Sequence, residues 1–175
     1  GRGRDKPVSD ETMAASGTIK AHNTTLESIK YSRTAFTLLD QRQLPFTTVY
    51  DEVRSVQDVW TAIKEMRVRG APAIAVSAAL GIATAARIKM EANDADVTAS
   101  VAAARAFLLS SLDFIATSRP TAVNLFNAVA LMKQRVEAST ADNAAALVEA
   151  FIVMAEDMYR EDVSFNERIM HHGAA

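Results

Sequence analysis

The sequence predicts a mostly α-helical fold that carries a small antiparallel β-meander near its N-terminus. Across residues 25–54, apolar and polar residues alternate in short runs, which is the two-residue period of half-buried strands. Across residues 55–165, apolar residues instead recur every three or four positions, the period of helices that bury one face. The chain has 175 residues, 49% of them hydrophobic and 23% charged, so it is long enough and apolar enough to bury a core.

The meander is expected to contain three strands. Its alternating runs cover residues 29–31, 36–38 and 46–50, and Pro45 separates the last two. The preceding residues 1–24 are polar, rich in Gly, Ser and Thr, and show no period. We expect them to form a disordered tail or a remnant of an expression vector.

The first two helices have clear start signals. Ser55 and Asp58 stand three residues apart and match a capping box, in which each side chain accepts from the other residue's backbone N–H. The second helix is expected to start at Pro72, which is favoured at the first helical position because the N–H that it lacks has no helical partner there. The residues that follow, as far as Ala86, are apolar on nearly every side, which predicts a helix at the centre of a bundle.

Three further helices complete the predicted bundle, which spans residues 55–165. They are expected to follow turn and capping residues at 93–96, 118–121 and 140–142. Their inward-facing stripes comprise Val97, Val101, Ala104, Leu108 and Leu112 in the third helix, Leu125, Val129, Met132 and Val136 in the fourth, and Leu147, Phe151, Met154 and Met158 in the fifth. The polar residues 166–175 are expected to form a linker.

Composition and charge argue against several classes of protein. A formal charge of −2 and a pI near 5.9 give no bulk attraction to nucleic acid. The absence of Cys excludes disulfides, thiolate metal sites and a cysteine nucleophile within these 175 residues. The apolar run over 71–86 is shorter than the roughly 20 residues that span a bilayer, so no membrane partner is expected. Without an apolar signal segment, a cytoplasmic location is expected, with the nucleus as a further one. No metal site and no cofactor are expected.

Two arginines stand directly before predicted helix starts. Arg69 precedes a Gly-Ala-Pro segment, and Arg119 precedes Pro-Thr. A helix start presents unpaired N–H groups and a partial positive charge, and a guanidinium adds a forked, permanently charged donor. Together these can hold a phosphate or a carboxylate, with Gly70 allowing close approach and Ser118 or Thr121 adding a hydroxyl. The simpler alternative is that both arginines are solvated.

Three other signals are weaker. Adjacent residues such as His171 and His172 point about 100° apart on a helix and do not chelate a metal, so a tail or structural role is favoured. The run Asp40-Gln41-Arg42 predicts a turn with an ion pair, although a ligand-facing loop is the alternative. The four carboxylates at positions 156, 157, 161 and 162 are interpreted as a solvated helix face.

Several blocks resemble, in order along the chain, the N-terminal half of the methylthioribose-1-phosphate isomerase family. They are SIKYS (28–32), LLDQRQLP (38–45), AIKEMRVRGAPAIAVSAALG (62–81), SRPTAVNL (118–125) and NERIMHHGA (166–174). The family consists of aldose–ketose isomerases of methionine salvage and is related to regulatory subunits of translation initiation factor 2B. The blocks around both arginines are the most specific.

The resemblance implies a helical N-terminal domain of a two-domain α/β protein, whose Rossmann-like C-terminal domain is absent from this chain. It implies substrate contacts at Arg69, Gly70, Ala71 and Arg119, with a sugar phosphate as the anion. The expected catalytic cysteine and aspartate lie beyond Ala175, so no catalytic residue is named here. The implied reaction converts 5-methylthioribose 1-phosphate to 5-methylthioribulose 1-phosphate, and the implied partners are the missing domain and a second copy in a homodimer.

Two other functions remain open at this point. A regulatory subunit of an initiation factor 2B-like complex would act through protein contacts and is expected to lose the two arginines. A self-standing helical module that binds an anion is the third possibility, against which the polar, unclosed end of the sequence argues.

Overall fold

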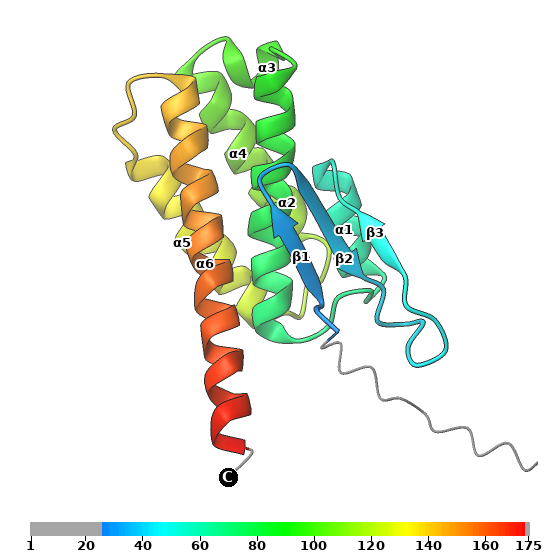
Figure 1. Ribbon diagram of the computed structural model, residues 1–175. Helices are drawn as coiled ribbons and strands as arrows, with labels where there is room; N and C mark the ends of the chain where they lie inside the picture. The colour runs from blue at the N-terminus through cyan, green and yellow to red at the C-terminus, as the bar shows by residue number, and fades with distance from the viewer. Residues whose placement is uncertain (1–25, 174–175) are drawn as a thin grey trace, which may run out of the picture.

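The computed structural model describes residues 26–173, with side chains as far as Asn166 and that of Arg168. The predicted tail over residues 1–24 lies outside the described residues. Figure 1 shows a short meander packed on one side of a helical bundle. Its elements are β1 (Ile29–Ser32), β2 (Ala35–Leu39), β3 (Tyr50–Glu52), α1 (Val56–Lys64), α2 (Ala71–Glu91), α3 (Ala95–Thr98), α4 (Val101–Ala116), α5 (Val123–Ala138) and α6 (Ala144–Gly173). The predicted fold class, mostly helical with a small antiparallel sheet, is confirmed.

The sheet is antiparallel in the order β1-β2-β3, but its third strand starts later than predicted. Tyr50 pairs with Leu39, whereas Phe46 is 91% exposed and belongs to a loop. The reason is that backbone groups after Asp40 form local turn hydrogen bonds with one another and do not pair with a neighbouring strand. The N–H groups of Phe46 and Thr47 both donate to the carbonyl of Gln43, so this segment follows turns and does not join the ladder.

The first two helices begin as the sequence predicts, within one residue. Ser55 Oγ accepts from the N–H of Asp58 at 3.2 Å and the Asp58 carboxylate accepts from the N–H of Ser55 at 2.9 Å, which completes the capping box. Helix α2 starts at Ala71, one residue before the expected Pro72. Its residues 74–86 are all buried, so it is the central helix of the bundle.

Close packing of α1 on α2 depends on Gly81. A Cβ atom built at this position lies 2.5 Å from Cγ1 of Val59, which is far inside van der Waals contact. The two helices can approach this closely only because residue 81 has no side chain. This contact sets the position of α1 against α2. The segment that contains Arg69 follows α1 directly.

The single helix predicted after residues 93–96 is two helices in the structure. Helix α3 ends at Thr98, and Ser100 then caps α4 by accepting from the N–H of Ala103 at 3.0 Å. The periodic stripe hides this break, because the apolar spacing continues through it. The buried members of that stripe are Val97, Ala104, Leu108 and Leu112.

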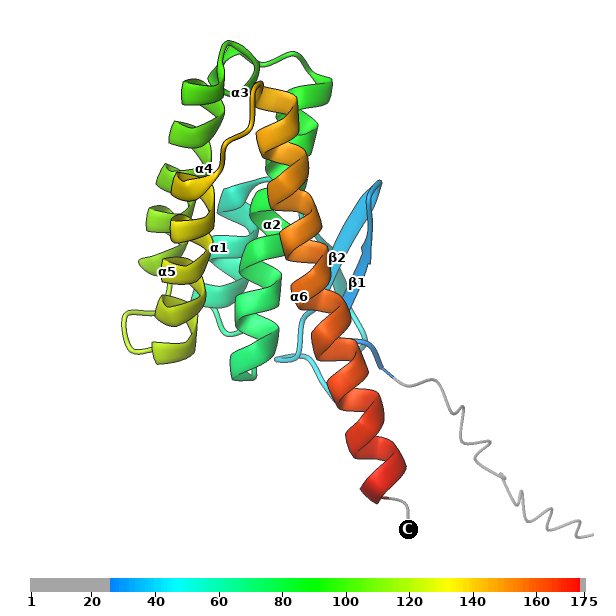
Figure 2. The same cartoon turned by 90° about the vertical axis from the view of Figure 1, so that its left-hand side faces the viewer.

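Helices α5 and α6 bury the stripes that the sequence predicts, except that Met158 is only half-buried. Helix α6 then continues through residues 166–173, the segment expected to be a linker. In Figures 1 and 2 this part of α6 extends beyond the rest of the bundle. The backbone therefore shows no break at residue 165, where the predicted bundle ends.

One carboxylate expected to be solvated is buried instead. Glu156 is 9% exposed and ties α6 to the β1–β2 hairpin. It accepts from Arg33 Nε at 2.9 Å and from the Tyr31 hydroxyl at 3.2 Å. The Arg33 guanidinium lowers the pKa of Glu156 below its ordinary value, and burial together with this carboxylate raises the pKa of Tyr31 to about 12.

Candidate functional site

The first predicted contact segment lies in the turn between α1 and α2. Arg67 forms ion pairs with Asp51 and Glu65, each at 2.8 Å, and so has a structural role. Arg69 is exposed, and its Nε donates only a long hydrogen bond, 3.4 Å, to the carbonyl of Met66. Two neighbouring arginines therefore have different roles, and Arg69 is the one available to a ligand.

Glycine is needed at position 70 because of its backbone conformation and not because a side chain would lack space. Its φ is 95°, a conformation that side chains of L-residues rarely adopt, while nothing lies within 4 Å of the position a Cβ would take. Gly70 is the N-cap of α2 and, having no side chain, leaves the first N–H groups of the helix without a side-chain acceptor.

The second predicted segment has the same construction at the start of α5. Arg119 is half-buried, and its carbonyl accepts from the N–H of Ala122, which turns the chain into the helix. Ala122 is the N-cap of α5 and offers no acceptor either. The Ser118 hydroxyl, one of two expected to face the ligand, is buried and donates to the carbonyl of Ile115 at 2.7 Å. Thr121 is exposed and remains the hydroxyl of this segment.

The structure brings the two segments together around one cavity of about 340 Å³. Both α2 and α5 start at the same end of the bundle, as Figure 2 shows. The cavity is lined by Gly70, Ala71, Ile74, Arg119, Thr121, Ala122, Val123, Asn124 and Leu125. Three of the four predicted contacts, Gly70, Ala71 and Arg119, thus line the same cavity. Arg69 comes directly before Gly70 in the chain but does not line the cavity. Asn124 was not singled out from the sequence, although it lies in the SRPTAVNL block.

These two helix starts differ from the others in the described part of the chain. Side chains of Ser55, Asp94 and Ser100 cap α1, α3 and α4, and Asn143 accepts from the N–H of Ala146 at 2.8 Å at the start of α6. Among the described helices, only α2 and α5 have no side-chain cap. Their free N–H groups and helix dipoles make the shared cavity electropositive.

The side-chain charge at the cavity is positive, like the helix N-terminal ends that face it. Arg119 is the one charged residue that lines the cavity, and no described carboxylate lies within ion-pair distance of it. Other arginines of the chain, such as Arg33 and Arg42, have carboxylate partners at 2.8–2.9 Å. An anion is the ligand that complements this arrangement.

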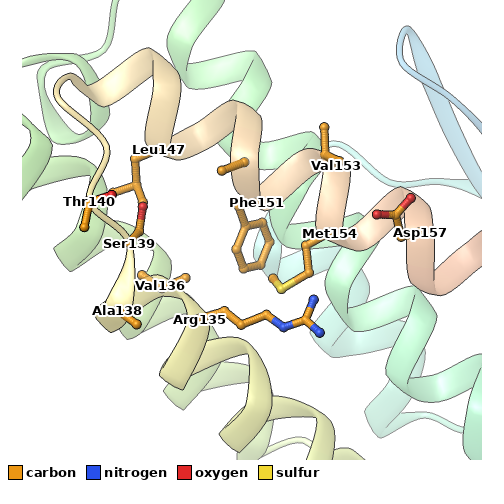
Figure 3. A pocket seen from close by; sticks show the side chains of 11 residues that line it. Arg135, Val136, Ala138, Ser139, Thr140, Leu147, Phe151, Val153, Met154 and Asp157 are labelled. Atoms are coloured by element: carbon orange, nitrogen blue, oxygen red, sulfur yellow. The ribbon is translucent and has the colours of Figure 1, made fainter.

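A second cavity, of about 440 Å³, lies between α5 and α6 (Figure 3). Phe151 and Met154 point into it from α6, the Arg135 side chain extends across it from α5, and Asp157 is also among its lining residues. The α5 residues that line it come from the end of that helix, where the dipole is negative, and Arg105 already binds the carbonyls there. This cavity is therefore less suited to an anion than the first.

The remaining sequence signals have structural explanations or lie outside the described side chains. Arg42 Nη2 pairs with Asp40 at 2.8 Å, which confirms the predicted turn with an ion pair. The guanidinium holds the pKa of the buried Asp40 carboxyl well below its usual range. The side chains of His171 and His172 are outside the described set. Among the described residues, no group of three or more His, Cys, Asp or Glu is placed to hold a metal.

Helix α2 has the length and hydropathy of a membrane span, with 21 residues and a mean hydropathy of 1.5. However, 72% of its apolar window is buried inside the bundle. The core helix of a soluble protein has the same length and composition, so this helix is weak evidence for a membrane partner.

Comparison with known proteins identifies the family. A family model described as the initiation factor 2 subunit family matches residues 67–175, which include both arginine segments. The chain belongs to the initiation factor 2 subunit family. The chain is also similar to methylthioribose-1-phosphate isomerase 1 of Trypanosoma cruzi, 58% identical over 156 residues, and to the methylthioribose-1-phosphate isomerase of Leishmania infantum, 55% identical over 157. These matches confirm the resemblance inferred from the motifs.

Two solved structures share the fold. The 5-methylthioribose 1-phosphate isomerase of Pyrococcus horikoshii has a TM-score of 0.71 and 30% identity over 86% of this chain. Subunit delta of translation initiation factor eIF-2B from A. fulgidus has a TM-score of 0.67 and 34% identity over 79% of it. The chain spans 40% and 38% of these two structures, and 41–42% of the two curated relatives, whose matches cover 89% of this chain.

Proposed function

We propose that this chain is the N-terminal part of an aldose–ketose isomerase that converts 5-methylthioribose 1-phosphate to 5-methylthioribulose 1-phosphate in methionine salvage. The observation that carries the proposal is the cavity where two uncapped helix starts meet Arg119. A phosphate fits this electropositive cavity, and the isomerases among the relatives are named for a sugar phosphate.

The described residues would bind and orient the substrate. The N–H groups that are left unpaired in the first turns of α2 and α5 donate to phosphate oxygens, and the Arg119 fork adds charge-assisted hydrogen bonds. Arg69, which is exposed beside the cavity, supplies a second cation as its side chain turns from Met66 towards the ligand. Fixing the phosphate holds the sugar in one orientation, which contributes to rate through proximity and electrostatic stabilisation.

The reacting groups are proposed to come from outside this chain. The family resemblance places a catalytic cysteine and a catalytic aspartate beyond Ala175, in a C-terminal domain. The phosphate on C1 blocks simple ring opening, so an acid is needed to open the furanose before hydrogen moves between C2 and C1. We further propose a homodimer of the full-length protein, in the cytoplasm or also in the nucleus, without nucleic-acid or membrane partners.

A regulatory subunit of an initiation factor 2B-like complex is the second candidate. The similarity to subunit delta from A. fulgidus keeps this candidate open, because the fold alone does not separate the two functions. The positively charged cavity favours the isomerase, since a subunit that acts through protein contacts has no need of two uncapped helices around an arginine.

The test compares the full-length protein with the 175-residue chain. The full-length protein should convert 5-methylthioribose 1-phosphate to the ketose, followed by NMR of the sugar, and the 175-residue chain alone should not. Turnover by the chain alone would contradict the division of the active site. A full-length protein that neither binds nor converts this sugar phosphate would favour the regulatory function.

A further inference from the structure

The cavity where α2 and α5 begin is rich in hydrogen-bond donors. The guanidinium of Arg119 offers five N–H donors and no acceptor, and the helix starts add backbone N–H groups. A phosphate oxygen accepts from all of these. A sugar hydroxyl must also donate its own hydrogen, and none of these groups can accept it.

The backbone supplies few acceptors in this cavity. The carbonyl of Gly70 accepts from Ile74, that of Arg119 from Ala122, that of Thr121 from Val123 and that of Ala122 from Phe126, at 3.0–3.2 Å. The other lining carbonyls belong to the hydrogen-bond ladders of α2 and α5. Each lining carbonyl therefore already accepts one hydrogen bond, and the acceptors not yet engaged are side chains.

Two lining side chains can accept a hydrogen bond, Thr121 and Asn124. The rest are apolar, cationic or absent. Asn124 combines an acceptor oxygen with an NH₂ donor, so it matches a hydroxyl, which both donates and accepts. The Thr121 hydroxyl can donate and accept as well, so what singles out Asn124 is its position in the helix.

The position of Asn124 in α5 supports a role outside the helix. It is the second residue of the helix and is exposed, whereas asparagine stabilises helices chiefly from the N-cap position. Asn143 does cap α6 through its Oδ1, and the cap of α5 is Ala122. A sequence that served only to stabilise α5 would have asparagine at the N-cap, position 122, and alanine at position 124.

We propose that Asn124 determines specificity by accepting a hydrogen bond from a sugar hydroxyl of the bound sugar phosphate, while the helix starts and Arg119 hold its phosphate. This inference rests on the proposed function, and it assigns the hydroxyl contact to one residue. It predicts that Asn124 distinguishes a sugar phosphate from inorganic phosphate.

The experiment uses the full-length protein and measures two constants, the Michaelis constant for the substrate sugar phosphate and the inhibition constant for inorganic phosphate. Asn124→Leu should raise the Michaelis constant at least tenfold and leave the phosphate constant within twofold. The matched control is Asn127→Leu, one turn further along α5, exposed and absent from the cavity lining, which should change neither. A Tm within about 2 °C of the parent shows that the variants are folded.

Deoxy analogues of the substrate identify the contact. The analogue that lacks the bound hydroxyl should bind the parent protein about tenfold more weakly, and Asn124→Leu should weaken its binding no further. An equal loss for phosphate and sugar phosphate in Asn124→Leu, or no loss at all, overturns the assignment of Asn124 alone. A parent protein that binds inorganic phosphate but not 5-methylthioribose 1-phosphate overturns the proposed function and this inference with it.

Discussion

Replacing Arg119 by alanine in the full-length protein is expected to weaken binding of 5-methylthioribose 1-phosphate by at least tenfold. Arg119 is half-buried, lines the cavity and has no carboxylate partner among the described residues, so its hydrogen-bonding capacity is available to the ligand. A hydrogen bond to a charged group contributes about 1.5–3 kcal/mol. Since about 1.4 kcal/mol corresponds to a factor of ten, losing this contact should cost roughly 10- to 150-fold in affinity.

The assay is isothermal titration with the substrate or a non-reactive analogue, at low and at high salt. Arg119→Lys keeps the charge but loses the planar fork, and should fall between the parent and the alanine variant. Arg54→Ala is the matched control, because the Arg54 side chain is 71% exposed and its nearest carboxylate oxygen, on Glu52, is 3.8 Å away. If Arg119→Ala and Arg54→Ala bind the substrate within twofold of each other, the argument that the helix starts and Arg119 form an anion site is refuted.

Three other substitutions probe contacts beside the cavity and in the rest of the fold. Arg69→Ala should also weaken substrate binding about tenfold or more, by titration, because the exposed guanidinium has only a long bond to give up. Gly81→Ala should lower the free energy of unfolding by about 1–2 kcal/mol, since the new methyl overlaps Val59, and the cost should shrink when combined with Val59→Ala, as urea unfolding will show. Asp40→Asn should destabilise by about 1–3 kcal/mol at pH 6, because it breaks the bond to Arg42. The folded pKa of Asp40 is lowered, so this stabilisation is complete above its ordinary pKa of 3.8 and is lost as the pH falls below it; urea unfolding at pH 3 should show a smaller gap.

The sequence predicted the local structure correctly where the interacting residues lie within a few positions of each other in the chain. The capping box at Ser55 and the ion pair between Asp40 and Arg42 each join residues at most three apart, so the sequence displays both partners. The inward stripes of α5 and α6 follow from spacing alone. The errors came where one pattern fits two structures. The stripe over residues 97–112 continues through the cap at Ser100, and the alternation at 46–50 resembles a strand although turns take up its hydrogen bonds.

Long-range contacts were beyond the sequence. Glu156 looks like part of a solvated face, because the residues that bury it, Tyr31 and Arg33, lie more than 120 positions away. Gly81 gave no sign of its contact with Val59 for the same reason. Such pairs are decided by how the helices pack, and no local period encodes that packing.

The sequence by itself determined the residue types at the candidate site. It placed Arg69 and Arg119 before two helix starts, because capping and helix-dipole chemistry depend on neighbours in the chain. Only the tertiary structure decided that the two starts face one cavity, that Arg119 lines it while Arg69 stands beside it, and that Asn124 lies where it can accept from a ligand. The physical reason is that α2 and α5 begin about 50 residues apart, and the bundle packing that aligns their N-terminal ends is a property of the whole core.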